Sequence, residues 1–239
     1  KNIEEFNSDV KSNEGYLYTT HPSASSVFAN NRISEAVFLH VAPFTRLVDI
    51  GCGDGTYTAE IRAKFPQMYI EGLDPATEAI EIARKKYSSI IFQTRNILDT
   101  NETENAHFDV GVLRGVLHHL TDQQLAIRNA LLLAPTIVII EPNGNNPILK
   151  IIEQVSSYHR SHEEQSFSAH KLRSWCINAG ATIVTQEYIG FVPFFFPTFL
   201  ARIIYFMQPL LEKAPLIREF FSAQIVIVCT ISKVDSQKK

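Results

Sequence analysis

The chain has 239 residues, of which 45% are hydrophobic and 20% are charged, and its formal net charge is −3 at pH 7. This length and composition fit one large α/β domain with a sizeable core. The charge balance, with no block of Lys or Arg, lacks the basic stripe that a nucleic-acid binder uses to neutralise phosphates. We therefore expect no nucleic-acid partner, whereas a small-molecule ligand is compatible with this composition.

The first expected element is a helix at residues 24–42, where apolar side chains recur at roughly helical spacing until Pro43 ends the pattern. The apolar positions of this helix are Val27, Ile33, Val37 and Val41. We assign residues 1–43 to an N-terminal helical cap and residues 44–239 to the main domain.

Short apolar runs then alternate with segments of helical periodicity. The expected strands are 47–50, 69–74, 90–94, 108–113 and 136–141, and the expected helices are 56–65, 76–87 and 121–133. Thr121 is the predicted N-cap of the last of these helices. Repeated strand–helix units with apolar strands indicate a parallel sheet covered by helices on both faces.

The last third of the chain departs from this alternation. A helix is expected at 168–180, followed by strands at 182–189 and 223–232. The two strands bracket residues 190–222, which are apolar, aromatic and rich in proline. Since ordinary connections have about 4–6 residues, we interpret this segment as a lid or acceptor-binding insertion.

Within the insertion, residues 198–211 predict an amphipathic helix. Its apolar residues form two adjacent lines, one of Phe199, Ile203, Phe206 and Leu210 and one of Leu200, Ile204, Met207 and Leu211, opposite Arg202, Tyr205 and Gln208. Three interpretations stay open: packing on the domain core or on a homodimer partner, a pocket for a hydrophobic acceptor, and shallow membrane attachment. Because residues 191–211 carry three prolines and a central arginine, we do not expect a membrane-spanning helix.

The strongest motif is LVDIGCGDGTYTAEI, in which a buried strand runs into a glycine-rich turn and a helix. Gly51, Gly53 and Gly55 permit the tight turn and let a ligand approach the backbone closely. Asp74 ends the next strand, about 20 residues further on, where a carboxylate can hold a ribose diol. The motif therefore predicts a ribose-containing ligand beside this turn.

Asp49, two residues before the first glycine, separates two kinds of cofactor. A dinucleotide would bring its pyrophosphate to this turn, where the carboxylate would repel it. The dinucleotide fingerprint also has a glycine at the position that Thr56 occupies here. S-adenosylmethionine (SAM) has no phosphate, and its cationic amino group and sulfonium favour a nearby carboxylate. These residues argue against a nicotinamide oxidoreductase and favour SAM.

With these motifs the chain resembles the class I SAM-dependent methyltransferase family, and most of all its small bacterial members whose fourth strand ends in VLHHL. The resemblance covers roughly residues 45–142. It implies an α/β fold with a Rossmann-like seven-stranded sheet, mostly parallel, with helices on both faces and an antiparallel last strand. It also implies SAM as the cofactor and S-adenosylhomocysteine as the product.

The resemblance assigns cofactor contacts residue by residue. Those around the methionine part of SAM are Asp49, Gly51, Gly53 and Gly55, with Cys52 as a small packing residue inside the loop. Asp74 corresponds to the acid that binds the ribose hydroxyls, and Pro75 packs near the adenine. Asn96 and Ile97 contact the adenine edge, and Arg114 lies under the methyl group. Two positions depart from the family, since Asn96 stands where Asp is common and Arg114 where small or polar residues are usual.

Two histidines, His118 and His119, follow the fourth strand and are the candidate general bases. Histidine suits this role because its proton transfer is easily tuned to near-neutral pH. The alternative is a structural role for both rings. The candidate acceptor contacts are Tyr18, His21, Glu141, Asn143 and Phe195.

No metal site and no disulfide framework are expected. His159, His162 and Glu163 could share one helix face, but a solvated polar loop is the commoner arrangement for such a segment. The cysteines are Cys52, Cys176 and Cys229. Because they are far apart and odd in number, a reducing cytosol is the expected compartment.

We therefore expect methyl transfer from SAM to a small-molecule or lipid-linked acceptor by in-line displacement. The alternative is a SAM-binding domain without activity that serves as a structural partner. The expected location is the cytoplasm. Peripheral contact with the inner membrane face through residues 198–211, and a homodimer, are left open.

Overall fold

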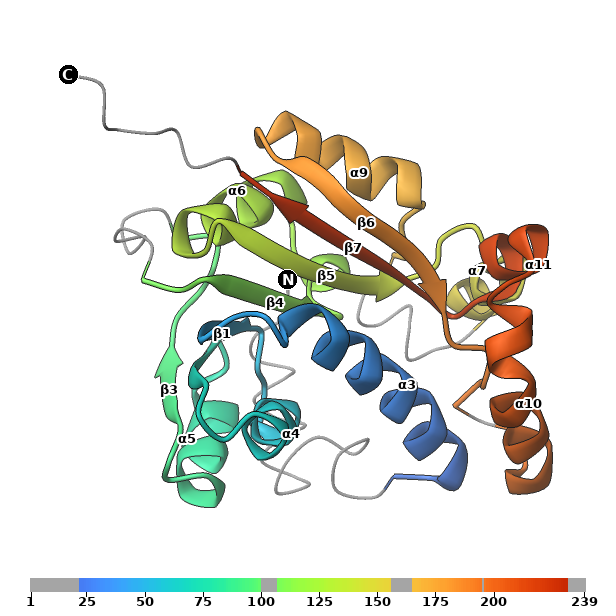
Figure 1. Ribbon diagram of the computed structural model, residues 1–239, viewed down its shortest axis with the longest axis horizontal. Helices are drawn as coiled ribbons and strands as arrows, with labels where there is room; N and C mark the ends of the chain where they lie inside the picture. Colours follow the sequence, from blue (N-terminus) through green and yellow to red (C-terminus); the bar gives the residue numbers. More distant parts are fainter. Residues whose placement is uncertain (1–21, 100–106, 156–164, 195, 232–239) are drawn as a thin grey trace.

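The computed structural model describes residues 22–99, 107–155, 165–194 and 196–231 (Figure 1). Within these ranges the strands form a seven-stranded sheet in the order β3-β2-β1-β4-β5-β7-β6. The strands are β1 (Arg46–Ile50), β2 (Tyr69–Asp74), β3 (Ile91–Thr94), β4 (Val110–Arg114), β5 (Thr136–Pro142), β6 (Thr182–Ile189) and β7 (Gln224–Thr230).

The topology confirms the predicted Rossmann-like arrangement. Strands β1 to β5 are parallel, and β7 runs antiparallel to both β5 and β6. The register places Asp49 of β1 beside Gly72 of β2 and Val112 of β4. The carboxyl ends of these three strands therefore meet at one edge, which is where open α/β sheets bind their ligands.

The helices match the predicted segments closely, and two were not predicted. They are α3 (Ala24–Val41), α4 (Thr56–Lys64), α5 (Thr77–Lys86), α6 (Gln123–Leu133), α7 (Pro147–Val155), α9 (Ala169–Asn178), α10 (Thr198–Leu211) and α11 (Pro215–Phe221), with a 3-10 turn at Leu117–His119. The bounds of α10 are those predicted, and the other predicted bounds differ by one or two residues. The additional helices α7 and α11 both lie in connections after the fifth and sixth strands.

The prediction that Thr121 caps α6 is wrong. Asp122 is the N-cap, because its carboxylate accepts a hydrogen bond from the backbone N–H of Leu125 at 2.9 Å. The cap therefore lies one residue further along the chain, and both residue types are ordinary N-caps.

Helices pack against both faces of the sheet, as predicted. Neighbouring residues of β1 show the two sides, since Leu47 packs with α3 and α4 while Val48 packs with α6 and α9. Helix α3 buries Ile33, Val37 and Val41 in the first of these cores. The N-terminal helix therefore shares a core with the main domain.

Helix α10 packs along α3 at one end of the molecule (Figure 1). This contact agrees with the interpretation that α10 packs on the domain, but the side of α10 that faces α3 is not the apolar line. Gln208, from the predicted polar side, is buried, whereas Phe206, from the apolar line, is 87% exposed. Among the described helices, none is both long and apolar enough to cross a bilayer.

Candidate cofactor and acceptor site

The glycine loop after β1 has a backbone that only glycine adopts easily. Gly51, Gly53 and Gly55 have φ values of 77°, 56° and 76°. A Cβ atom on Gly51 would lie 2.5 Å from a side-chain carbon of Val116, too close for any real contact. The loop therefore runs tightly between β1 and the turn after β4, and its backbone is available to a ligand.

Asp74, at the end of β2, holds the loop from the side. The backbone N–H groups of Gly53 and Ala76 donate to its two carboxylate oxygens at 2.9 and 2.8 Å. Burial raises the pKa of this carboxyl group, and the two backbone hydrogen bonds oppose that rise. Since a carboxylate offers about four acceptor directions, Asp74 keeps capacity for the two hydroxyls of a ribose.

Asp49 lies beneath the loop and is 5% exposed. Its carboxylate accepts a hydrogen bond from the hydroxyl of Thr58 at 2.5 Å. Burial nevertheless raises the pKa of Asp49 to about 6, more than Thr58 and the nearby Arg114 lower it. A buried carboxylate of this kind is stabilised when a cation arrives, so it fits the positive charges of SAM.

A cavity of about 130 Å³ lies at this carboxyl edge of the sheet. The predicted cofactor residues that line it are Gly51, Gly53, Asp74, Pro75, Asn96, Ile97 and Arg114. Asp49, Cys52 and Gly55 are not among its lining residues. They support the loop from behind, as the packing of Cys52 with Phe92 of β3 shows.

Several lining residues were not predicted. They are Ile50, Leu73, Ala76, Arg95, Gly115, Val116 and Leu120. Each is next to a predicted residue or lies in the VLRGVLHHL segment. Extending the predicted motifs by one or two positions would therefore have identified them.

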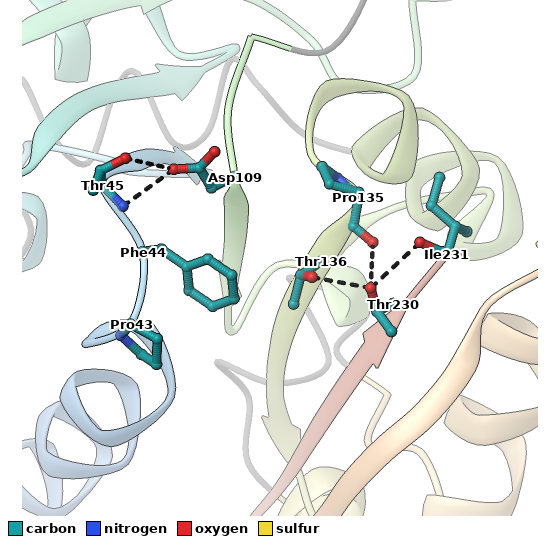
Figure 2. A pocket seen from close by; sticks show the side chains of 8 residues that line it. All are labelled: Pro43, Phe44, Thr45, Asp109, Pro135, Thr136, Thr230 and Ile231. Atoms are coloured by element: carbon teal, nitrogen blue, oxygen red, sulfur yellow. Dashed lines mark hydrogen bonds between the residues drawn. The ribbon is translucent and has the colours of Figure 1, made fainter. Parts of the chain in front are cut away.

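A larger cavity, of about 350 Å³, lies at the opposite edge (Figure 2). It is bordered by residues at the amino ends of β1, β4 and β5, among them Thr45, Asp109 and Thr136. The Asp109 carboxylate already accepts hydrogen bonds from the backbone N–H and hydroxyl of Thr45 at 3.1 and 2.8 Å. The glycine loop, both acids and His119 lie at the other edge, which is the edge where open α/β sheets bind their ligands.

The adenine-side residues are held by turns. The side-chain oxygen of Asn96 accepts a hydrogen bond from the backbone N–H of Leu98 at 3.0 Å. Its amide nitrogen is therefore the better-placed end for a ligand, and not the carbonyl. The carbonyl of Ile97 accepts from the side chain of Asn129 at 2.7 Å, which fixes this strip against α6.

Arg114 joins the cavity to α3. Its guanidinium lies 3.5 Å from the ring centre of Tyr57 and donates to Ser34 and Asn30, at 3.0 Å in each case. Both acceptors belong to α3. Arg114 therefore lines the cavity and at the same time anchors the N-terminal helix beside it.

His118 and Glu141 form a pair across the ends of β4 and β5. Glu141 is fully buried, and one of its oxygens accepts from the backbone N–H groups of Val116 and Leu117 at 2.9 and 2.7 Å. The other oxygen lies 2.8 Å from Nδ1 of His118. The ring of His119, which lines the cavity, lies 3.9 Å from that of His118 between centroids. Glu141 therefore contacts a histidine directly.

Asn143 is fully buried, and its amide nitrogen donates to the carbonyl of Glu219 and to Ser222. It connects the end of β5 to α11 and does not line the cavity. Other candidates lie outside the described residues, namely Tyr18, His21, His159, His162, Glu163 and Phe195. In the described ranges no group of His, Cys, Asp or Glu side chains is arranged to hold a metal ion.

Comparison with known proteins agrees with this geometry. Residues 48–135 match a family model described as a methyltransferase domain. A trans-aconitate 2-methyltransferase from Acidovorax ebreus is 34% identical over 88 residues, which are 35% of this chain and 34% of that relative. An uncharacterized methyltransferase from Mycobacterium tuberculosis is 28% identical over 82 residues, or 34% and 41% of the two chains. The matched segments span between 20% and 41% of the curated relatives.

Solved structures match over almost the whole chain. A SAM-dependent methyltransferase from Thermotoga maritima, described as a possible histamine N-methyltransferase, has a TM-score of 0.69 at 16% identity and covers 96% of this chain and 99% of its own. The magnesium protoporphyrin IX methyltransferase of Synechocystis, with bound S-adenosylhomocysteine, has a TM-score of 0.68 at 12% identity, with coverage of 96% and 98%. At these identities the similarity establishes the fold.

The sheet order and the glycine loop define a Rossmann-like fold with a cavity at its carboxyl edge. Residues 48–135 are similar to a methyltransferase domain, and the chain is similar in fold to SAM-dependent methyltransferases. SAM is the cofactor of such methyltransferases, and the residues at the edge fit it: glycines with positive φ, a buried acid under the loop, and Asp74 beside it.

Proposed function

We propose that this chain transfers a methyl group from SAM to an oxygen or nitrogen of a small-molecule or lipid-linked acceptor, and that His118 removes the acceptor's proton. The observation that supports this proposal is the pairing of His118 with the buried Glu141 beside the cofactor cavity, with 2.8 Å between Nδ1 and the carboxylate. The intact cofactor edge supports activity over a purely structural role, because a domain without turnover has no physical need for this pair.

Glu141 determines how His118 can act. When Nδ1 carries a proton and donates it to the carboxylate, the neutral ring keeps a lone pair on Nε2 that can accept a proton. The carboxylate then stabilises the imidazolium that forms. Glu141 is thus a positioning residue, and its backbone partners at Val116 and Leu117 hold its own orientation.

When bound, SAM would supply a methyl group activated by its sulfonium, with S-adenosylhomocysteine as the leaving group when the acceptor's lone pair takes the methyl. The chain would contribute alignment: Asp74 would accept hydrogen bonds from the ribose hydroxyls and Asp49 would offset the cationic end. Asn96 would donate from its amide nitrogen to the adenine edge, and Ile97 would pack against it. The acceptor's proton would pass to Nε2 of His118, with His119, whose ring lies beside it, as the second candidate base.

The proposal is tested by turnover with a defined acceptor panel. We would measure S-adenosylhomocysteine release with phenols, carboxylic acids and primary amines, each in free form and linked to an acyl chain. At least one class should react, and His118→Ala should lower kcat about 10²- to 10⁴-fold. Glu141→Gln should lower kcat and shift the pH profile, while SAM affinity by calorimetry stays the same in both variants.

The controls separate the alternatives. His119→Ala, compared with His118→Ala, shows which ring is the base. Equal turnover in wild type and His118→Ala would contradict the assigned role. Tight SAM binding without turnover on any acceptor class would favour the structural-partner alternative. NAD should not bind, because Asp49 lies beneath the loop where a pyrophosphate would be placed.

A further inference from the structure

Helices α10 and α11, which follow each other in the chain, both present exposed apolar side chains, and we call this set the outer face. Its members are Phe199, Ile203, Phe206 and Leu210 of α10 and Leu216, Ile217, Phe220 and Phe221 of α11. Two of them, Phe206 and Leu216, are 87% and 73% exposed. Exposed apolar side chains gathered on adjoining helices are typical of surfaces that a partner or a membrane covers.

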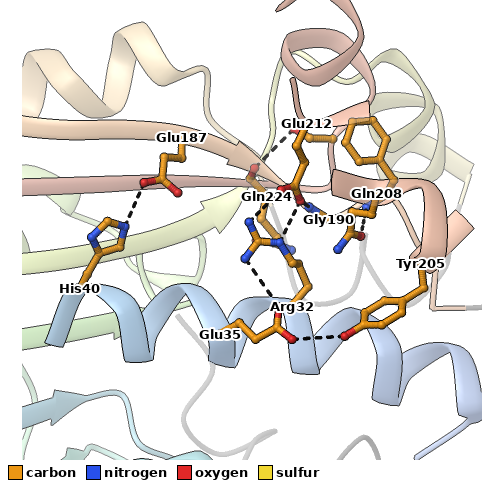
Figure 3. A network of polar contacts seen from close by, with 11 residues as sticks. Arg32, Glu35, His40, Glu187, Gly190, Tyr205, Gln208, Glu212 and Gln224 are labelled. Atoms are coloured by element: carbon orange, nitrogen blue, oxygen red, sulfur yellow. Dashed lines mark hydrogen bonds and ion pairs between the residues drawn. The ribbon is translucent and has the colours of Figure 1, made fainter. Parts of the chain in front are cut away.

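The orientation of α10 is held by polar contacts on its inner side (Figure 3). Glu212 accepts two hydrogen bonds from Arg32 of α3, at 2.9 and 2.8 Å, and one from the backbone N–H of Gly190 at 3.1 Å. The buried side chain of Gln208 accepts from the backbone N–H of Phe191 at 3.0 Å.

A further contact joins Tyr205 of α10 to Glu35 of α3, at 3.2 Å between the hydroxyl and the carboxylate (Figure 3). Gln208, which is 3% exposed, lies on the opposite side of the helix from Phe206. Rotating α10 until its apolar line faced α3 would therefore break these polar contacts. The outward direction of the outer face is thus built into the fold.

The charges around the outer face are asymmetric. Arg202, Lys213 and Arg218 are exposed. The acids of the same segment, Glu212 and Glu219, are only partly exposed, and Glu212 is paired inward with Arg32. The exposed charges between residues 198 and 221 are therefore all positive, which complements an anionic surface. Glu35 is exposed, but it lies on α3, on the inner side of α10.

The outer face is connected to the cofactor edge through two elements. Asn143, just beyond Glu141 on the chain, donates to the carbonyl of Glu219 in α11 at 2.9 Å. On the other side, α3 contacts α10 through Arg32 and the cofactor cavity through the Ser34 hydroxyl, which accepts from Arg114. A surface covering α10 and α11 would therefore lie beside the edge at which we place the acceptor.

From this arrangement we infer that the outer face docks into the headgroup region of a bilayer that contains anionic lipids, with α10 and α11 lying in the plane of the interface. Apolar side chains would enter the acyl boundary while the three cations contact lipid phosphates. The inference deepens the proposed function, because it makes the acceptor one that is presented from the membrane.

The test is binding of the full chain to lipid vesicles without SAM or acceptor, so it is independent of turnover. In sedimentation, vesicles of phosphatidylcholine with about 30% phosphatidylglycerol should bind the protein, and vesicles of phosphatidylcholine alone should bind it more weakly. High salt should weaken binding. Phe206→Ser with Leu210→Ser should lower the vesicle affinity about tenfold or more. Arg202→Gln with Lys213→Gln should lower it about fivefold for each cation removed.

Matched controls are provided by exposed leucines elsewhere. Leu39→Ser on α3 and Leu132→Ser on α6 remove comparable exposed apolar side chains and should leave vesicle binding unchanged. Calorimetric SAM binding checks that every variant is folded. Vesicle binding equal in the outer-face and control variants would overturn the inference. A failure of the protein to bind either kind of vesicle would also overturn the inference. This holds for a monomeric protein and equally for a dimer that the Phe206 and Leu210 changes dissociate.

Discussion

The glycine loop and the insertion at residues 190–222 lie near the same sheet edge but are held in different ways. The loop is held by its own backbone, since Gly51 and Cys52 both donate to the carbonyl of Leu73 at 2.7 and 3.1 Å. The insertion is held by side chains distant in sequence, such as Arg32 and Glu212, which are 180 positions apart.

This difference teaches how each region responds to change. In the loop, backbone conformation and steric fit leave no room for a side chain, so a single carbon is enough to disturb it. In the insertion, most of the surface is open and the stability resides in a few polar contacts. The outer face can therefore vary without loss of fold, whereas the contacts beneath it cannot.

The largest effect is expected for Gly51→Ala. The added Cβ would be 2.5 Å from Val116 at a φ of 77°, so we expect a loss of about 2–5 kcal/mol in the free energy of unfolding, from overpacking and left-handed backbone strain. Urea denaturation would measure it. Gly180→Ala is the matched control, because Gly180 has a φ of 87° but no atom within 4 Å of the added carbon. It should lose only about 1–2 kcal/mol. Equal losses would show that backbone strain, and not the fit against Val116, dominates in the loop.

A smaller effect is expected for Glu212→Gln. The change removes the charge from a bidentate pair with Arg32 that is mostly shielded from solvent, and we expect a loss of about 1–3 kcal/mol. Limited proteolysis should also cut more readily around α10. The control is Glu35→Gln, on the same interface but with a side chain 56% exposed, which should change stability by no more than about 0.5 kcal/mol. Similar small losses in both would mean that apolar contacts hold α10 on α3.

The pH dependence of SAM binding probes the loop more gently. Burial raises the pKa of Asp49 to about 6, so below that pH the ligand-free protein carries this carboxyl group mainly in its neutral form. A cationic ligand favours the ionised form, so binding releases a proton and affinity falls as the pH drops through 6. We expect SAM to bind about tenfold more weakly at pH 5 than at pH 7 in calorimetry. Asp49→Asn should bind SAM more weakly at pH 7 and should lose most of this dependence. An unchanged slope in that variant would assign the titration to another group, such as one of the histidines.

The amino-acid sequence by itself determined the features that depend on neighbouring residues. Apolar runs and helical spacing located the strands and most helices to within one or two residues, including all of α10, but missed α7 and α11. The positions of Gly51 and Asp74 located the cavity at the carboxyl edge of the sheet, because tight turns and strand ends follow from local backbone stereochemistry. Residues flanking these motifs, such as Arg95 and Val116, were missed only because the motif pattern stops short of them.

The tertiary structure decided which distant residues meet. Glu141 contacts His118 because β4 and β5 are neighbours in the sheet, and Arg114 contacts Ser34 because α3 crosses the face beneath it. The side of α10 that faces inward could not be predicted for the same reason. Amphipathicity shows that a helix has two sides, but Arg32 and Gly190, which contact the polar side, are supplied by other parts of the chain. Such pairings depend on the order and direction of the strands, which no local pattern encodes.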